Sequence, residues 1–162
     1  MIQRLRHVIA WNVLGILAIL SVIIIPTSVK ADSLMDVIYT DEETTEDFSK
    51  AYSTPKARGA YLAYGVGQIT KLSDMKLNVY GETAAARDSY LTLEMYLERK
   101  QDGSYYTYKM WEFYREDAPL LTASINVLVP TGTFYRLSTY HAAKNGVTRE
   151  STGATTYGIY MG

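Results

Sequence analysis

Residues 96–114, YLERKQDGSYYTYKMWEFY, hold an Asp-Gly pair between two segments that mix charged and aromatic side chains. Asp102 and Gly103 favour a tight two-residue turn, because both central positions of that turn need a positive φ. Polar and apolar side chains alternate before the pair, and aromatic side chains dominate after it. The stretch therefore predicts a β-hairpin, from which the rest of the fold can be worked out.

The register of this hairpin decides whether its aromatic rings lie in the core or on the surface. A regular two-residue turn would bring four aromatic side chains to the polar face, as a candidate binding surface of Tyr96, Tyr105, Trp111 and Phe113. One β-bulge would reverse this, because a shift of one residue turns the later side chains to the opposite side of the sheet. Large aromatic residues are core residues more often than ligand platforms. We therefore favour the bulge, with Trp111 in the core.

Short segments with alternating polarity, bounded by Gly, Asp, Asn and Pro, continue on both sides of the hairpin. This pattern is typical of β-strands. The expected strands lie near residues 59–64, 66–71, 75–83, 90–100, 104–115, 120–129, 133–142 and 147–160, with a break expected at Gly153 in the last. Seven to eight such strands predict an all-β domain over residues 58–162, an antiparallel β-sandwich with a small β-barrel as the alternative.

The first 31 residues have the three parts of a secretory signal peptide. Two arginines precede an apolar run over residues 8–25, and small and polar residues follow Pro26. We expect cleavage after Ala31 and a protein that is secreted or held at the cell envelope, without membrane contact after cleavage. The alternative is an uncleaved N-terminal membrane anchor, because the run is just long enough to span a bilayer.

Residues 32–57 carry a marked excess of acidic side chains and few residues of the buried type. This composition predicts a flexible acidic leader. Loss of residues 1–31 would lower the 16 basic residues to 13 against 17 acidic ones, a formal charge of −4. A nucleic-acid partner is therefore not expected, since phosphate binding needs a basic surface. The chain has no cysteine, so the core alone must hold the domain together, as is common in exported proteins of Gram-positive bacteria.

Few residues in the chain carry the chemistry of catalysis. His141 is the one histidine after the predicted cleavage site, and thiol catalysis and zinc sites of His and Cys are excluded. Glu94 and Glu98 share a strand face, as a glycosidase pair would, but surface ion pairs with Arg99 and Lys109 are the simpler interpretation. We expect no catalytic residue, no metal and no cofactor.

Four segments resemble a family of small secreted proteins of Firmicutes, a domain of unknown function. The segments are RGAYLAYGVGQITKL from residue 58, GETAAARDS from 81, LTLEMYLERKQDGSYYTYKMW from 91 and FYRLSTYHAAKNGVTRESTGATTYGIYM from 134. The resemblance covers residues 58–162. It implies export and β structure, and it brings no catalytic residues with it.

The tyrosine-rich sheet surface and the lack of catalytic groups together indicate a binding protein. We expect an exported, non-enzymatic β-sandwich that binds a glycan or a protein at the cell envelope or outside the cell, because aromatic faces stack on sugars and anchor protein contacts. The alternative is a secreted bacteriocin-like or toxin factor. The oligomeric state does not follow from the sequence.

Overall fold

The Asp-Gly pair forms the hairpin that joins the two longest strands, β4 (Lys76–Gln101) and β5 (Ser104–Leu128). The structure is a computed structural model, and it describes residues 40–55 and 60–162. Asp102 and Gly103 have φ values of 49° and 82°, the left-handed values that a two-residue hairpin turn requires. The predicted turn is confirmed.

A bulge follows this turn and sets the facing of the aromatic residues. Glu98 pairs with Thr107, whereas Leu97 pairs with Lys109, so that Tyr108 is an extra residue on β5. Beyond the bulge, Trp111 lies opposite Met95, whose side chain is fully buried. Trp111 therefore packs against the core, and the bulge favoured from the sequence is confirmed.

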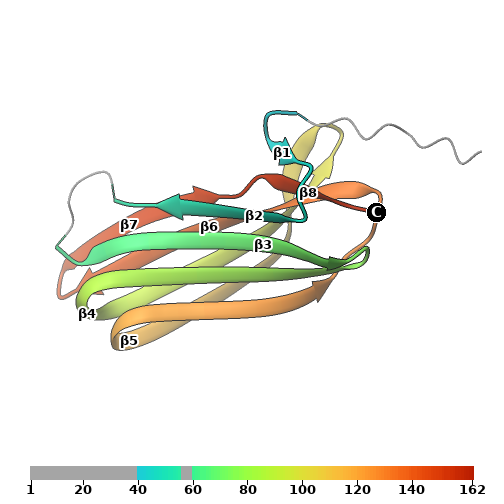
Figure 1. The fold of residues 1–162 in the computed structure, drawn as a ribbon. Coiled ribbons are helices and arrows are strands. Elements are labelled where there is room, and N and C mark those ends of the chain that lie inside the picture. Colours follow the sequence, from blue (N-terminus) through green and yellow to red (C-terminus); the bar gives the residue numbers. More distant parts are fainter. Residues whose placement is uncertain (1–39, 56–59) are drawn as a thin grey trace, which may run out of the picture. The chain divides into compact units, whose positions relative to one another are not determined.

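All eight strands belong to one sheet in the order β1-β8-β6-β4-β3-β2, with β5 beside β4 and β7 beside β6 (Figure 1). Every pair is antiparallel except β1 with β8. The remaining strands are β1 (Glu43–Thr44), β2 (Phe48–Ser53), β3 (Leu62–Ser73), β6 (Thr133–Asn145), β7 (Thr148–Thr155) and β8 (Gly158–Met161).

The sheet folds back on itself because β4 and β5 both bend in their middle. The first half of β4 pairs with β3, its second half pairs with β6, and β5 follows it along the other edge throughout. The pairing of β4 with β5 is irregular between Ala84 and Leu91, and Asp117 on the facing strand has a φ of 44°. Such irregularities bend a strand and increase its twist. We call this bend the corner.

The corner divides the sheet into a front layer with β2 and β3 and a back layer with β6, β7 and β8 (Figure 1). The sheet is nearly closed into a barrel, and both predicted descriptions, sandwich and small barrel, fit it. The predicted all-β fold is confirmed. The strands are longer than predicted, since β3, β4 and β5 each unite two of the expected segments.

The core lies between the layers. Its fully buried side chains include Ile69, Leu77, Val79, Leu91, Leu93, Met95, Leu97, Tyr135, Leu137, Ile159 and Met161. Gly65 lies inside β3, where the sequence predicted a boundary between two strands, because it allows close contact with the opposite layer. A Cβ atom at Gly65 would lie 2.2 Å from the ring of His141.

The second half of the predicted leader belongs to the sheet, which corrects the prediction of a flexible segment over residues 32–57. Residues 48–53 form β2 and pair with β3, and β1 pairs with β8. Strand pairing satisfies the backbone hydrogen bonds that a free segment would leave to water. The predicted signal peptide and residues 32–39 lie outside the described residues. Within the described ranges, no helix is long and apolar enough to cross a membrane.

Candidate functional site

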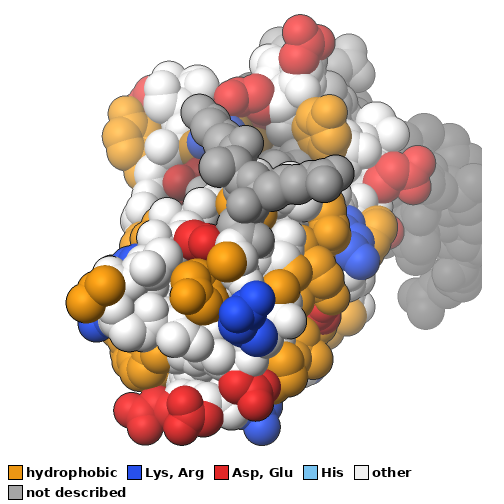
Figure 2. Space-filling view, turned by 90° about the vertical axis from the view of Figure 1, so that its left-hand side faces the viewer, with side chains coloured by type: hydrophobic (Ala, Val, Ile, Leu, Met, Phe, Trp, Pro, Cys, Tyr) orange, Lys and Arg blue, Asp and Glu red, His pale blue; other side chains and the backbone are white. Residues whose placement is uncertain are grey.

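A pocket of about 700 Å³ lies on the outer surface of the back layer, beside the corner. Its lining comes from β4, β5, β6, β7 and the turn between the last two strands. Figure 2 faces the end of the sheet where β4 and β5 bend, and acidic, basic and apolar side chains lie close together there. This volume lies within the range of about 300–1,000 Å³ that is typical of small-ligand sites. We call it the tyrosine pocket.

Two tyrosine rings form one wall of the tyrosine pocket. The ring centroids of Tyr90 and Tyr114 are 5.9 Å apart, with an angle of 36° between the planes. Tyr90 belongs to β4 and Tyr114 to β5, and because Tyr114 pairs with Thr92, the two tyrosines are diagonal neighbours on one face of the sheet. Both side chains are more than one third exposed, so their faces are available to a ligand.

Small side chains form the floor of the tyrosine pocket. Thr92 and Ala142 are neighbours on β4 and β6, and both line the pocket although they are only 5% and 2% exposed. Thr92 alternates with the core residues Leu91 and Leu93, so that its side chain lies on the pocket side. Among the described residues its hydroxyl has no hydrogen-bond partner. The hydroxyl is open to the pocket, since Nε of Arg99 is the one buried side-chain polar atom without a partner in the described part of the chain, and it is therefore available to a ligand.

Six charged side chains line the same pocket. They are the acidic residues Asp88, Glu94, Glu112 and Asp117 and the basic residues Lys144 and Arg149. Every ion pair among the described residues lies elsewhere in the sheet, although both signs of charge are present here. Both the acidic and the basic side chains of the pocket are therefore available to a charged or polar ligand.

Glu94 and Glu112 lie directly opposite each other on β4 and β5. The hydroxyl of Tyr96 donates a hydrogen bond to Glu94, and this contact raises the pKa of Tyr96 to about 12. Glu112, as the acceptor of a hydrogen bond, likewise raises the pKa of Tyr114 to about 12. Each carboxylate thus has a neutral tyrosine beside it rather than a cation.

The four aromatic residues of the predicted binding surface do not share one surface. Tyr96 lies on the outer face, beside the tyrosine pocket, whereas Trp111 and Phe113 face the opposite side and pack against the core. Tyr105 lies near the hairpin turn and donates a hydrogen bond of 2.8 Å to Glu43. A single ligand platform built from these four rings does not exist in the structure.

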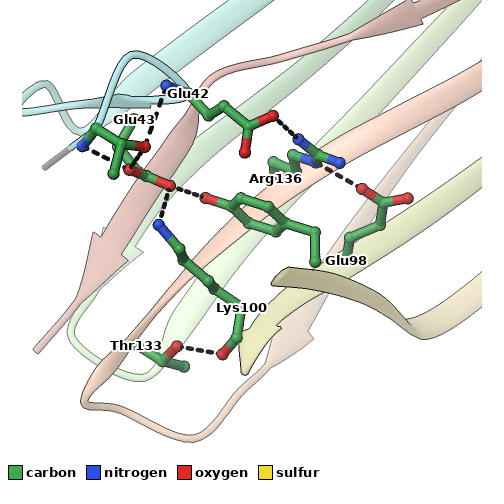
Figure 3. Close-up of polar contacts among 8 residues, drawn as sticks. Glu42, Glu43, Glu98, Lys100, Thr133 and Arg136 are labelled. Carbon is green, nitrogen blue, oxygen red and sulfur yellow. Dashed lines mark hydrogen bonds and ion pairs between the residues drawn. The ribbon is translucent and has the colours of Figure 1, made fainter. Parts of the chain in front are cut away.

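Tyr105 belongs to a polar network that holds the N-terminal strand β1 (Figure 3). Glu43 accepts hydrogen bonds of 2.8 Å from Lys100 and 2.7 Å from the backbone N–H of Thr40, and Arg136 lies 4.0 Å above the ring of Tyr105. Burial alone would raise the pKa of Glu43, but the hydrogen bonds, with that from Lys100 first, lower it to about 2. These contacts stabilise the fold and leave Glu43 little access to a ligand.

The candidate catalytic groups are also in structural positions. Glu98 lies on the same face of β4 as Glu94, as expected, but it forms an ion pair of 2.6 Å with Arg136 (Figure 3). His141 is fully buried, with its Nδ1 2.9 Å from the hydroxyl of Thr83 and its Nε2 2.8 Å from that of Thr139. Burial lowers the pKa of His141 to about 4, so this ring is neutral at physiological pH.

Sequence reasoning missed the residues that form the tyrosine pocket, above all Tyr90, Thr92 and Tyr114. The one available signal was the pair of charged segments around Asp88 and Asp117, which mark the corner where the pocket lies. Within the described part of the chain, no group of three or more His, Cys, Asp or Glu side chains could hold a metal ion.

Comparison of the chain with protein-family models, with curated proteins and with solved structures finds no match. The resemblance to small secreted proteins of Firmicutes stays a prediction. The functional argument therefore rests on the geometry of the tyrosine pocket.

Proposed function

We propose that this protein is a non-enzymatic glycan-binding protein whose ligand occupies the tyrosine pocket. The observation that carries the proposal is a pocket in which two adjacent tyrosine rings adjoin charged groups of both signs, none of which forms an ion pair among the described residues. Aromatic rings offer a flat apolar surface on which the flat side of a sugar ring can stack.

The polar lining favours a sugar over an apolar ligand. Every sugar hydroxyl can both donate and accept hydrogen bonds, as a Ser or Thr hydroxyl does. The carboxylates of Glu94 and Glu112 only accept, whereas Lys144 and Arg149 only donate. A polyhydroxylated ligand can satisfy both kinds of group at once, and the hydroxyl of Thr92 offers a further partner at the floor.

Export of the protein is part of this proposal. The signal-peptide pattern of residues 1–31 supports a location outside the cell or at the cell envelope, where glycans are abundant. The lack of cysteine supports it less directly, since it accords with export in Gram-positive bacteria. The partner we propose is a glycan of that environment, and the protein needs no cofactor for binding it.

Two tyrosine variants test the proposed function. Tyr90→Ala and Tyr114→Ala remove one ring each, and each should weaken glycan binding about tenfold, because an aromatic contact contributes roughly 0.5–1.5 kcal/mol beyond its buried area. The measurement is isothermal titration calorimetry of the full chain with a panel of soluble oligosaccharides. Tyr106→Ala is the matched control, because Tyr106 is a similarly exposed tyrosine of β5 that does not line the pocket.

A second variant examines the floor. Thr92→Val removes a hydroxyl that has no partner among the described residues, so the free energy of unfolding should stay the same or rise, while glycan binding weakens. If no oligosaccharide of the panel binds, or if Tyr106→Ala weakens binding as much as the pocket variants do, the proposed function is wrong.

A further inference from the structure

We infer that the glycan of the tyrosine pocket carries a protonated amine, which lies between the carboxylates of Glu94 and Glu112. The inference rests on the proposed function and names the class of sugar, an oligosaccharide of amino sugars with free ammonium groups. Its basis is an uncompensated pair of negative charges in the wall of the pocket.

Glu94 and Glu112 are directly opposite residues of an antiparallel pair. The Cβ atoms of such residues are about 4.5–5.5 Å apart, and like charges in this position destabilise a sheet. No lysine or arginine forms an ion pair with either carboxylate among residues 40–55 and 60–162. A cationic group of the ligand would remove this repulsion, because each carboxylate could accept a hydrogen bond from the same ammonium.

Lys144 lies too far along the strand to do this, and Arg149 reaches the ring of Tyr140 beside Glu94 but forms no ion pair with the carboxylate. Glu94 pairs with Tyr140 on β6, whereas Lys144 pairs with Tyr90. Four residues along a strand correspond to about 13 Å. Arg149 on β7 pairs with Lys144, and its guanidinium lies 5.8 Å from the ring of Tyr140. The two glutamates therefore form the acidic end of the pocket.

An observation independent of the acidic side chains points to a ligand in the same place. Thr92 lies two residues from Glu94 on the same face of β4, is 5% exposed and lines the floor. Its hydroxyl has no hydrogen-bond partner among the described residues and is open to the pocket, since Nε of Arg99 is the one buried side-chain polar atom without a partner in that part of the chain. The adjacent ring of Tyr114, which pairs with Thr92, adds an aromatic face that attracts cations as well as sugar rings.

An N-acetylated sugar fits this end less well than a sugar with a free amine. Acetylation replaces an ammonium, which has three donors and a positive charge, by a neutral amide with one donor. Two facing carboxylates would then stay largely uncompensated, and their desolvation would oppose binding. The free amine thus distinguishes the expected ligand from a neutral glycan of the same length.

The test compares two probes of equal length, glucosamine oligosaccharides and their fully N-acetylated counterparts. Calorimetric titration of the full chain is made at mildly acidic pH, where the amine is protonated and glutamates are ionised. We expect the glucosamine oligosaccharide to bind about tenfold more tightly, the effect of one hydrogen bond to a charged group. Glu94→Gln and Glu112→Gln should abolish this preference. Glu116→Gln, on the same strand as Glu112 but outside the pocket lining, should retain it.

The outcomes separate this inference from the proposed function. Equal binding of both probes, unchanged in Glu94→Gln and Glu112→Gln, would overturn the inference and leave a neutral glycan site. Failure of both probes and of every other oligosaccharide would overturn the proposed function itself. Lysine oligomers serve as a polycation without sugar rings, and binding of these as tight as that of glucosamine oligosaccharides would also overturn the inference.

Discussion

His141 connects the two layers through a single buried ring. Its Nδ1 lies 2.9 Å from the hydroxyl of Thr83 in the front layer, and its Nε2 lies 2.8 Å from that of Thr139 on its own strand, whose hydroxyl donates to the carbonyl of Ala154. Burial lowers the pKa of this ring and so favours its neutral form. The ring therefore stabilises the core only while it remains uncharged.

The stability of the protein should fall between pH 6.5 and pH 4 because of His141. Burial lowers the pKa of this residue from its ordinary value of 6.5 to about 4 in the folded protein, so the unfolded chain binds a proton first as the pH falls. The free energy of unfolding should drop by about 3 kcal/mol across this interval. Urea denaturation at several pH values measures it.

The carboxylates lose their contribution to the free energy of unfolding at lower pH than His141 does, so the two effects can be measured separately. The pKa of Glu43 falls from 4.5 to about 2 on folding, so its stabilisation is present above pH 4.5 and is lost as the pH approaches 2. His141→Gln is the control, and its unfolding free energy should be lower at pH 7 but nearly constant from pH 6.5 to pH 4.5. A wild-type curve that is flat in the same range would contradict the prediction.

Gly65 should not tolerate a side chain. A Cβ at this position would lie 2.2 Å from Cδ2 of His141, and overpacking of a core typically costs about 1–3 kcal/mol. Gly65→Ala should therefore lower the free energy of unfolding by about 2 kcal/mol in urea denaturation. The same change in a His141→Ala background should cost much less. An equal cost in both backgrounds would show that the contact with His141 is not the cause.

Strand β1 is held mainly by the buried carboxylate of Glu43, its first residue. Glu42, which directly precedes the strand, contributes less. The side chain of Glu43 is fully buried against Lys100, whereas that of Glu42 is 59% exposed beside Arg136. Removing one partner of a buried ion pair typically costs about 3–5 kcal/mol, but an exposed pair contributes about 0–1 kcal/mol. The two neighbours therefore form a matched pair of test positions.

Glu43→Gln should lower the free energy of unfolding by about 3 kcal/mol, because the ammonium of Lys100, only 15% exposed, would lose its counter-charge. Glu42→Gln should lower it by less than about 1 kcal/mol. Chemical denaturation of both variants at neutral pH measures the difference. Equal effects of the two changes would mean that burial of Glu43 does not hold β1.

Local chemistry explains which elements the sequence could predict. The hairpin followed from Asp102 and Gly103 because its turn depends on two adjacent residues. The place of β1 in the sheet could not be predicted, since it depends on Lys100 and Tyr105, which lie 57 and 62 residues from Glu43 in the chain. When these distant contacts are unknown, the composition of the acidic segment alone predicts disorder.

The tyrosine pocket was unpredictable for a related reason. Tyr90 and Tyr114 share a face because the bulge at Tyr108 shifts the pairing of β4 with β5 by one residue, and the strand pattern of the sequence does not show where extra residues lie. The sequence predicts a strand boundary at Gly65, but this glycine lies inside β3, where the opposite layer comes too close to leave room for a side chain. Glycine marks both turns and close backbone contacts, and only the fold distinguishes them.

At the scale of the whole domain, β4 makes the two layers mutually dependent. Its first half pairs with β3 in the front layer and its second half with β6 in the back layer, while β5 accompanies both halves. Separating either layer would break the hydrogen bonds of a strand that continues into the other. The contact between Thr83 and His141 joins the layers again inside the core. Neither layer therefore forms a core of its own.

We therefore expect residues 40–162 to unfold in one cooperative transition. Trp11→Phe leaves Trp111 as the sole tryptophan, and its fluorescence reports on the back layer, where it packs against the core. The denaturation midpoint measured by this fluorescence should coincide with the midpoint measured by far-ultraviolet circular dichroism, which reports on all strands. Hydrogen exchange at Ile69 of β3 and Leu137 of β6 should give similar free energies of opening. Separate midpoints, or a front layer that opens at much lower free energy than the back layer, would show that β4 does not couple them.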